Sequence, residues 1–513
     1  MNDLSRRAGL IVGLVVALIG CVTLFDHTLV GVFYDDGLYA GLARALGTGH
    51  GYVHLHMPGA PAAVHYPPLY PVLLAPFFGL FSLDAAALAG KVLNIVLAGG
   101  TAGLVAWHAT RIKLLGEEAP VWLAPAVVAA AAVAVPVLAT QSVLFSEPLF
   151  AVLFAGAIVA ADQDPPRPWL AGSLAALALL TRSIAIAAAA GIVAYLTLMR
   201  RTPRADAPHG RTPRADALRV VAPVAVAAAA WAVWVTTHRH GIDPALGLNY
   251  GSYNDVMTQA GLGALGSSLS DLPRPLGVMT LSWLGVPILY KVLGFAALTV
   301  GLYGLVVLAR RSSAGWSLIG YLAILAVWPY PGDRFLWAVL PWIALAWSAA
   351  VVELVQVRQL RAAAAIVAAT VVIGYGIYEF RGYSGRWWGT VARGISANFR
   401  ELLPAVAELP ADAVVASDDE ALVWLYTGRR AVPFYIWTLK GRESVEPSAA
   451  EHRAYLERQG VTHVLFTGPG SGSDHELERL QSAYPGWLTI VRRWPASEGR
   501  ALFQVRIAHS VVP

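Results

Sequence analysis

The sequence is poor in cysteine and in charged residues. A single cysteine, Cys21, occurs among 513 residues, which excludes a disulfide framework and any cluster of thiolate metal ligands. Charged residues make up only 13% of the chain, whereas about a quarter is usual for a soluble domain, and 57% of the residues are hydrophobic. The net charge of +5 is small and concentrated in a few short loops, so it reports membrane topology and not a nucleic-acid partner. These deficits indicate a polytopic α-helical membrane protein.

The hydrophobic runs predict about eleven transmembrane helices, each close to the ~20 residues that cross a bilayer. Arg6 and Arg7 precede the first run, which we interpret as a retained anchor with a cytoplasmic N-terminus. The run 169–199 is too long for one span, and Thr181-Arg182-Ser183 interrupts it, so we expect two short helices with Arg182 at the turn. The predicted spans are 9–25, 84–108, 120–139, 141–161, two within 169–199, 219–237, 281–309, 315–330, 334–357 and 361–380.

Composition divides the chain near residue 380. Residues 1–380 form the predicted membrane domain, with a first outer loop at 33–83, and residues 381–513 have the composition of a soluble domain. Because an odd number of spans separates the two termini, we expect this small α/β domain on the extracytoplasmic side. A polar loop repeats RTPRADA at 201–207 and 211–217, which favours a disordered linker. The predicted strands are 413–418, 462–468, 488–494 and 501–507, and a capped helix is predicted in 443–460.

Two adjacent carboxylates, Asp35 and Asp36, open the first outer loop. At a membrane surface such a pair can act as a general base toward an acceptor hydroxyl, or can hold a divalent cation against a phosphate. The alternative is that one of them caps the helix predicted from LYAGLARAL. Both roles can coexist, because one aspartate can cap while the other reacts.

Three histidines and a rigid Pro-Pro corner follow in the same loop. His54, His56 and His65 could ligate a metal, but their spacing matches no fixed ligand pattern, and hydrogen-bonded interfacial histidines are the alternative. Pro67-Pro68 fixes the backbone beside His65 and Tyr66. We therefore place His65 and Tyr66 where a sugar or a lipid phosphate would lie.

Three charged residues lie in or beside apolar helices. Glu147 begins a predicted span, Arg182 lies between two short helices, and Arg334 opens a late span. Charges at such positions usually face a cavity, a substrate or each other, and guanidinium groups suit a phosphate. The alternatives are a Glu147–Arg182 ion pair, a helix-dipole role for Glu147, and interfacial anchoring for Arg334.

Four stretches together resemble a known superfamily. YDDGLYAGLARALGTGHGY, HYPPLYPVLLAPFF, SEPLF and GDRFLWAVLP resemble the GT-C superfamily of polyprenyl-phosphate-sugar-dependent glycosyltransferases, in the branch of the protein O-mannosyltransferases and the aminoarabinose transferase of lipid A. The resemblance covers about residues 10–380. It implies a catalytic acidic pair at Asp35 and Asp36, a lipid-phosphate contact at Arg334, and inverting transfer. Relatives of the aminoarabinose type carry acid-lysine-proline where this chain has Tyr66-Pro67-Pro68, so the donor sugar and the metal ligands of that motif do not carry over.

The sequence therefore predicts a cell-membrane glycosyltransferase that passes a hexosyl or pentosyl group from a polyprenyl-phosphate carrier to a hydroxyl of a lipid, glycan or protein. The metal requirement stays open, and no nucleotide cofactor is expected. A secondary transporter or flippase is the rival, because Glu147, Arg182 and a broken helix could form a substrate pathway. A scaffold that binds partners through the C-terminal domain is a third hypothesis, and it gives the Asp pair no purpose.

Overall fold

The computed structural model describes residues 2–199, 212–261, 265–386, 389–440, 443–468, 473–494 and 499–506. The first copy of the RTPRADA repeat and the start of the second lie outside these residues. The chain forms two compact units, described separately below. Unit 1 comprises Met1–Asp26, Lys91–Val233 and Leu262–Trp388, and unit 2 comprises His27–Gly90, Trp234–Gly261 and Gly389–Pro513. Unit 2 combines C-terminal residues with the first loop, so the predicted domain boundary at residue 380 stays a prediction.

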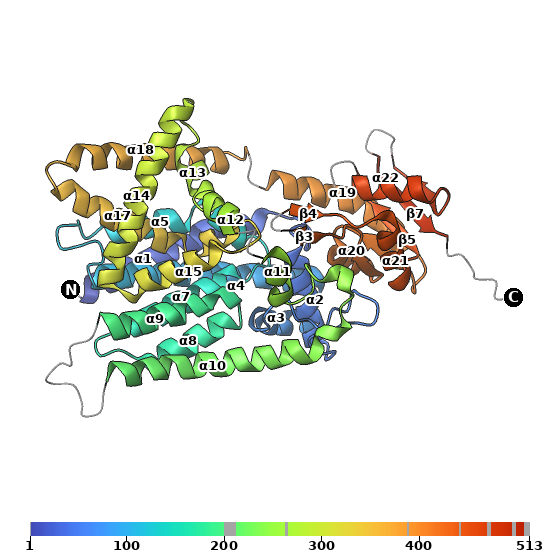
Figure 1. Ribbon diagram of the computed structural model, residues 1–513, viewed down its shortest axis with the longest axis horizontal. Coiled ribbons are helices and arrows are strands. Elements are labelled where there is room, and N and C mark those ends of the chain that lie inside the picture. Colours follow the sequence, from blue (N-terminus) through green and yellow to red (C-terminus); the bar gives the residue numbers. More distant parts are fainter. Residues whose placement is uncertain are drawn as a thin grey trace. The chain divides into compact units, whose positions relative to one another are not determined.

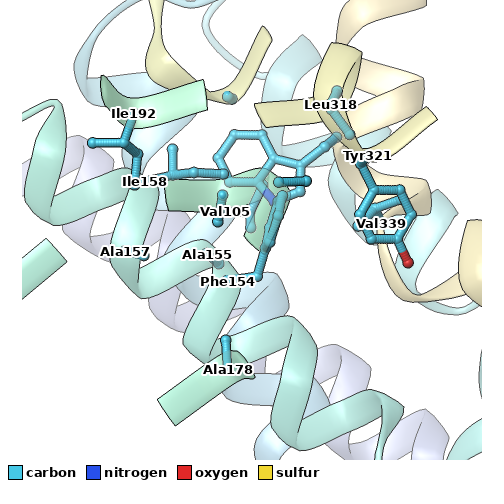
Figure 2. Packing of buried hydrophobic residues seen from close by; sticks show 14 of the residues in the cluster. Val105, Phe154, Ala155, Ala157, Ile158, Ala178, Ile192, Leu318, Tyr321 and Val339 are labelled. Carbon is cyan, nitrogen blue, oxygen red and sulfur yellow. The ribbon is translucent and has the colours of Figure 1, made fainter. Parts of the chain in front are cut away.

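Unit 1 is helical in its described residues, and its core is built from small and aliphatic side chains. Figure 2 shows this core, where Phe154 and Ile158 of one helix pack with Ile192, Leu318 and Tyr321 of others. Many alanines in the core let helix backbones approach closely, which is typical of helices packed in lipid. The helices that contribute residues to unit 1 are α1 (Asn2–Gly20), α4 (Leu83–Arg111), α5 (Leu123–Ala132), α6 (Val135–Gln141), α7 (Glu147–Ala161), α8 (Pro168–Leu179), α9 (Ile186–Leu198), α10 (Pro213–His238), α12 (Leu265–Asp271), α13 (Arg274–Leu281), α14 (Pro287–Arg311), α15 (Ser313–Leu325), α16 (Asp333–Ala338), α17 (Leu340–Gln356) and α18 (Arg361–Tyr383). Three-residue and five-residue 3₁₀ turns, η2 (Ser183–Ala185) and η1 (Cys21–Phe25), complete it.

The described residues contain five helices that are long and apolar enough to cross a membrane, or six if the α5–α6 pair counts as one span. Shorter apolar helices, among them α7, α8, α15 and α17, lie in the remaining predicted spans. The chain is thus a multi-pass membrane protein by helix length and composition. The count of eleven spans stays a prediction.

Helices α1 and α4 cross through four glycines. A Cβ atom added at Gly9 would lie 2.7 Å from the carbonyl oxygen of Gly103, and one added at Gly13 would lie 2.9 Å from that of Gly99. Both pairs are spaced by four residues, the small-xxx-small pattern of close helix pairs in membranes. Because backbone meets backbone, this crossing excludes any side chain larger than hydrogen at these positions.

The predicted span 120–139 is broken, and helices α5 and α6 are bent by 60° at Val133 and Ala134. Side chains of α18 satisfy the backbone groups that the break releases. Glu379 Oε2 accepts a hydrogen bond from the Val135 amide at 2.7 Å, and the Tyr383 hydroxyl donates to the Val133 carbonyl at 2.6 Å. The break within 120–139 was not predicted, whereas the run 169–199 is broken at Arg182 as predicted.

Unit 2 contains a mixed five-stranded sheet in the order β2-β1-β5-β7-β6. Strand β1 runs parallel to β2 and β5, whereas β7 runs antiparallel to β5 and β6. Four of these strands and helix α21, which Ser448 caps, lie where the sequence predicted them. The labels in Figure 1 locate β3 (Thr438–Lys440), β4 (Glu443–Val445), β5 (His463–Phe466), β7 (Ala501–Val505), α19 (Thr390–Ala407), α20 (Glu420–Thr427), α21 (Ala449–Arg458) and α22 (Asp474–Ala483). The other strands are β1 (Val414–Ser417), β2 (Arg430–Pro433) and β6 (Leu488–Arg493).

The first loop also belongs to unit 2 and contains two helices packed on each other. Helix α2 (Asp35–Gly47) is the predicted helix, and most of it is buried. Helix α3 (Leu69–Leu80) was not among the predicted elements. Helices α2 and α3 approach at Gly47 and Gly79, where an added Cβ would meet backbone atoms at 2.4–2.6 Å. Residues 234–261 add the short elements η3 (Arg239–Gly241), η4 (Pro244–Leu246) and α11 (Tyr253–Ala260).

Candidate functional site

The backbone immediately before the Asp pair has an unusual conformation. Tyr34 has φ +63° and ψ −70°, and the Asp35 amide donates to the Phe33 carbonyl at 2.7 Å. This combination is a γ-turn of the rare type, which is strained for any residue with a side chain. The strain lies at Tyr34, directly before the first residue of α2, where the turn sets the direction of Asp35.

The two aspartates have different surroundings. Asp36 is 2% exposed, and its carboxylate accepts hydrogen bonds from the amides of Gly31 at 2.8 Å and Phe33 at 3.1 Å. Burial raises the pKa of Asp36 to about 6, although these amides lower it. Asp36 thus ties down the loop that precedes the helix.

Asp35 is half-buried, and its Oδ1 accepts a hydrogen bond from the Tyr66 hydroxyl at 2.7 Å. Burial raises the pKa of Tyr66 well above its ordinary value of 10.0, and the charge of Asp35 adds to that shift, so the tyrosine stays a donor. Tyr39 packs edge-on against Tyr66 with ring centroids 5.1 Å apart. The structure therefore brings Asp35 and Tyr66 together, as a carboxylate oriented by a phenol.

His65 lies beside this pair. Its Nδ1 lies 2.7 Å from the carbonyl oxygen of Gly251, so Nδ1 carries the proton and Nε2 is the basic nitrogen. Burial lowers the pKa of His65, whereas the bond to Gly251 and the charge of Asp35 raise it. The rings of Tyr66 and Tyr253 lie 4.8 Å and 4.6 Å from the His65 ring.

The metal interpretation of the histidines is not supported. Among the residues that the structure describes, no group of three or more His, Cys, Asp or Glu side chains could hold a metal ion. His54 is buried against Tyr250, and neither of its ring nitrogens has a hydrogen-bond partner within the described part of the chain. Burial lowers the pKa of His54 well below 6.5 and that of His56 to about 3, so both rings are neutral.

Unit 2 also contains a buried acidic residue that was not among the predicted site residues. Glu420 is the first residue of α20 and is fully buried, and the Tyr250 hydroxyl donates to its Oε1. Burial raises the pKa of Glu420 to about 7, against the lowering effect of its hydrogen bond from Tyr250. One signal could have found it: Glu420 follows the carboxyl end of a strand, where parallel sheets place ligand-binding groups.

A second cluster of predicted residues lies within unit 1. Glu147 Oε1 lies 2.9 Å from Arg182 Nη1 and 2.9 Å from Arg334 Nη2, and Arg334 Nε also donates to it at 3.0 Å. The Glu147 side chain is 1% exposed, that of Arg182 12% and that of Arg334 35%. The predicted Glu147–Arg182 pair is therefore present, and Arg334 joins it.

All three charged residues of this cluster lie at helix ends. Glu147 begins α7, Arg182 precedes η2, and Arg334 is the second residue of α16. Aromatic rings cover the guanidinium groups: Phe335 lies 4.4 Å from that of Arg182, and Phe145 lies 3.7 Å from that of Arg334. Two cations share one anion, so the three side chains carry a net charge of +1, which suits a further anion.

The sequence matches no protein-family model and no curated protein, so the comparisons rest on solved structures. The crystal structure of ArnT from Cupriavidus metallidurans in the apo state is similar over 95% of this chain and 95% of that chain, with 14% identity and a TM-score of 0.56. The crystal structure of the Archaeoglobus fulgidus oligosaccharyltransferase in complex with Zn and sulfate is similar over 96% of this chain and 73% of that chain, with 14% identity and a TM-score of 0.50. The likeness at this identity concerns the fold. The chain thus shares the fold of these two proteins.

Proposed function

We propose that the protein is a membrane glycosyltransferase that moves a sugar from a polyprenyl-phosphate carrier to a hydroxyl acceptor with inversion. The observation that carries the proposal is the Asp35–Tyr66 pair, a half-buried carboxylate held in one orientation beside a strained turn. The shared GT-C fold supports the same class of reaction. We also propose eleven spans, a cytoplasmic N-terminus and an extracytoplasmic sheet in a plasma or inner membrane.

The proposed chemistry is a single displacement. Asp35 accepts the proton of the acceptor hydroxyl, whose oxygen forms a bond to the anomeric carbon of the sugar. The bond between that carbon and the phosphate oxygen breaks, and the polyprenyl phosphate leaves with the electron pair. Tyr66 donates to one oxygen of Asp35, which fixes the orientation of the carboxylate. Asp36 is committed to the amides of the preceding loop, so its role is structural.

We assign the arginine cluster of unit 1 to the phosphate of the carrier. Glu147 fixes Arg182 and Arg334 by binding both through one oxygen, and the remaining positive charge would attract a phosphate monoester or diester. The sugar, the acceptor and a requirement for a divalent cation are left open by this assignment. His65 and Tyr66 are the proposed contacts to the sugar.

A direct test measures consumption of a panel of polyprenyl-monophosphate sugars by the full-length protein in lipid nanodiscs. We expect Asp35→Asn to lose at least about a hundredfold in rate, the usual contribution of a general base. Asp84→Asn, an exposed carboxylate of the same unit, is the matched control and should keep the wild-type rate. Full transfer by Asp35→Asn would remove Asp35 from the mechanism.

The same panel of lipids distinguishes a transferase from a transporter. The transporter hypothesis is favoured by the broken helix pair α5–α6 and by the buried charges of unit 1. Protein reconstituted in liposomes is given the labelled lipid in one leaflet. Movement between leaflets without release of polyprenyl phosphate would identify a flippase. Release of polyprenyl phosphate that depends on Asp35 would identify the transferase.

A further inference from the structure

Residues 63–67, which include His65 and Tyr66, are buried although they form neither helix nor strand. A buried backbone of this kind must find hydrogen-bond partners outside regular structure. Pro67 and the following Pro68 have no amide hydrogen, so this segment supplies few donors of its own. We call residues 63–67 the corner segment, and side chains and backbone from other parts of unit 2 hold it.

Two residues within 234–261 bind the first half of the corner segment. Trp234 Nε1 donates a hydrogen bond to the Ala63 carbonyl at 2.9 Å. The His65 ring donates through Nδ1 to the Gly251 carbonyl at 2.7 Å. These two contacts fix Ala63 and His65, the residues that lead up to Tyr66.

Tyr52 holds Tyr66 itself. The Tyr52 hydroxyl donates to the Tyr66 carbonyl at 2.8 Å, and the two residues are 8% and 6% exposed. Burial raises the pKa of Tyr52 well above its ordinary value of 10.0, so its hydroxyl keeps the proton and stays a donor. Tyr66 in turn donates through its own hydroxyl to Asp35 Oδ1 at 2.7 Å. Two hydrogen bonds thus connect Tyr52 to the carboxylate of Asp35 through Tyr66.

The backbone of Tyr52 is fixed independently of its hydroxyl. The Ala63 amide donates to the Tyr52 carbonyl at 3.0 Å, and the His54 amide donates to the Pro61 carbonyl at 2.8 Å. An isolated antiparallel bridge lies between these two bonds, so residues 52–63 form a hairpin-like loop. Removal of the hydroxyl alone therefore leaves the ring of Tyr52 in place and deletes its bond to Tyr66.

The tip of this loop is held by two other parts of unit 2. The Ala431 amide of strand β2 donates to the His56 carbonyl at 2.7 Å. The Tyr250 hydroxyl gives its only proton to Glu420 Oε1, so His56 Nε2, which lies 2.9 Å from that hydroxyl, donates to it. The loop 52–63 is therefore held at its tip as well as at its base, and it gives Tyr52 a fixed support.

We propose that Tyr52 is a positioning residue for Asp35, which acts by holding the backbone of Tyr66. A shift of the Tyr66 backbone carries the hydroxyl with it, so loss of the Tyr52 bond misplaces the donor that orients Asp35. Displacements of about 1 Å can cost about a hundredfold in rate even when they arise far from the reacting groups. The catalytic effect of Tyr52 rests on the function proposed above, whereas the anchoring of Tyr66 does not.

The test uses phenylalanine variants of the full-length protein in lipid nanodiscs. Tyr52→Phe removes the hydroxyl that holds Tyr66, Tyr66→Phe removes the hydroxyl that orients Asp35, and a third variant combines both changes. Tyr455→Phe is the matched control, because Tyr455 is also a buried tyrosine of unit 2 whose hydroxyl donates to a backbone carbonyl, that of Pro433, at 2.9 Å. Steady-state kinetics are measured on any consumed polyprenyl-monophosphate sugar, and hydrogen exchange is measured in peptides covering 60–70.

We expect kcat of Tyr52→Phe to fall about tenfold while KM for the donor changes by less than about twofold, because the arginine cluster assigned to the carrier phosphate is untouched. The double variant should be no slower than Tyr66→Phe alone, because Tyr52 acts through the hydroxyl that Tyr66→Phe has already removed. Independent roles would instead make the two losses multiply. Tyr455→Phe should keep the wild-type kcat.

Exchange in 60–70 should increase about tenfold in Tyr52→Phe, the effect of one lost buried hydrogen bond, and should stay unchanged in Tyr455→Phe. An unchanged kcat in Tyr52→Phe overturns the proposal, and so does a double variant in which the two losses multiply. Unchanged exchange in Tyr52→Phe overturns the anchoring itself. If the wild type consumes no donor, the proposed function fails, and the exchange data alone decide whether Tyr52 holds Tyr66.

Discussion

Acidification should weaken the first loop of unit 2 through His56. The perturbation is a change from pH 7.5 to pH 5, compared between the wild type and His56→Gln. Glutamine can place an N–H group near the position of Nε2 and can still donate to Tyr250, but it does not titrate. The variant therefore separates the effect of protonating His56 from the effect of losing its hydrogen bond to Tyr250.

The magnitude follows from burial of the ring. Burial lowers the pKa of His56 from 6.5 to about 3, so at pH 5 the folded ring is neutral while the unfolded ring binds a proton. Above pH 6.5 the ring is neutral in both the folded and the unfolded state, so the lowered pKa costs no stability. As the pH falls below 6.5, only the unfolded ring gains a proton, and the folded loop loses stability. Because pH 5 lies about 1.5 pH units below the unfolded pKa, the loss is about 2 kcal/mol. This value holds for any folded pKa well below 5.

Hydrogen exchange of peptides covering 50–58, corrected for the intrinsic rates at each pH, measures the opening free energy of this loop. We expect the wild type to lose about 2 kcal/mol more than His56→Gln between the two pH values. His50→Gln replaces an exposed histidine of the same loop and should behave as the wild type does. If the wild type and His56→Gln lose stability equally, the buried, neutral state of His56 is refuted.

Three further changes test unit 1, each by thermal unfolding in micelles. Glu147→Gln leaves two guanidinium groups without their shared carboxylate, and we expect a loss of about 3–5 kcal/mol in stability. The same substitution at an exposed glutamate should cause no loss. Gly13→Val places a side chain against the backbone of Gly99, and a loss of about 1–3 kcal/mol is expected; an unchanged melting temperature would contradict the close crossing. Glu379→Leu leaves the Val135 amide unpaired, and we expect a loss of about 1–3 kcal/mol in stability. No loss would mean that water replaces the carboxylate as the acceptor.

Local patterns predicted most of the elements correctly. Short β-like runs located four strands of the sheet, and the predicted helix cap located α21. The break at Arg182 was predictable because a charge interrupts an apolar run that is too long for one span. The bend between α5 and α6 was missed because hydropathy averages over 120–139 and outweighed Pro136, which lies in the first turn of α6.

Contacts between residues far apart in the chain were harder to predict from the sequence. The charges of Glu147 and Arg182 in apolar sequence indicated that each needs a partner, and the two do pair. The buried contact of Glu420 with Tyr250 was not predictable, because an acidic residue at a helix start is fully explained by capping. The two residues are 170 positions apart in the sequence, and no local periodicity carries that information. Long-range contacts of this kind arise only when the sheet and the first loop fold together.

The glycine crossing of α1 and α4 has a consequence for how the first helix can be replaced. Any apolar segment of similar length can enter a bilayer, since insertion depends on hydropathy. Docking against α4 requires in addition two bare backbone patches, one helical turn apart, at Gly9 and Gly13. A chimera with a leucine-rich first helix should therefore insert with the correct orientation and yet leave α4 without its partner. The sequence of helix α1 therefore determines both its insertion into the bilayer and its packing against α4.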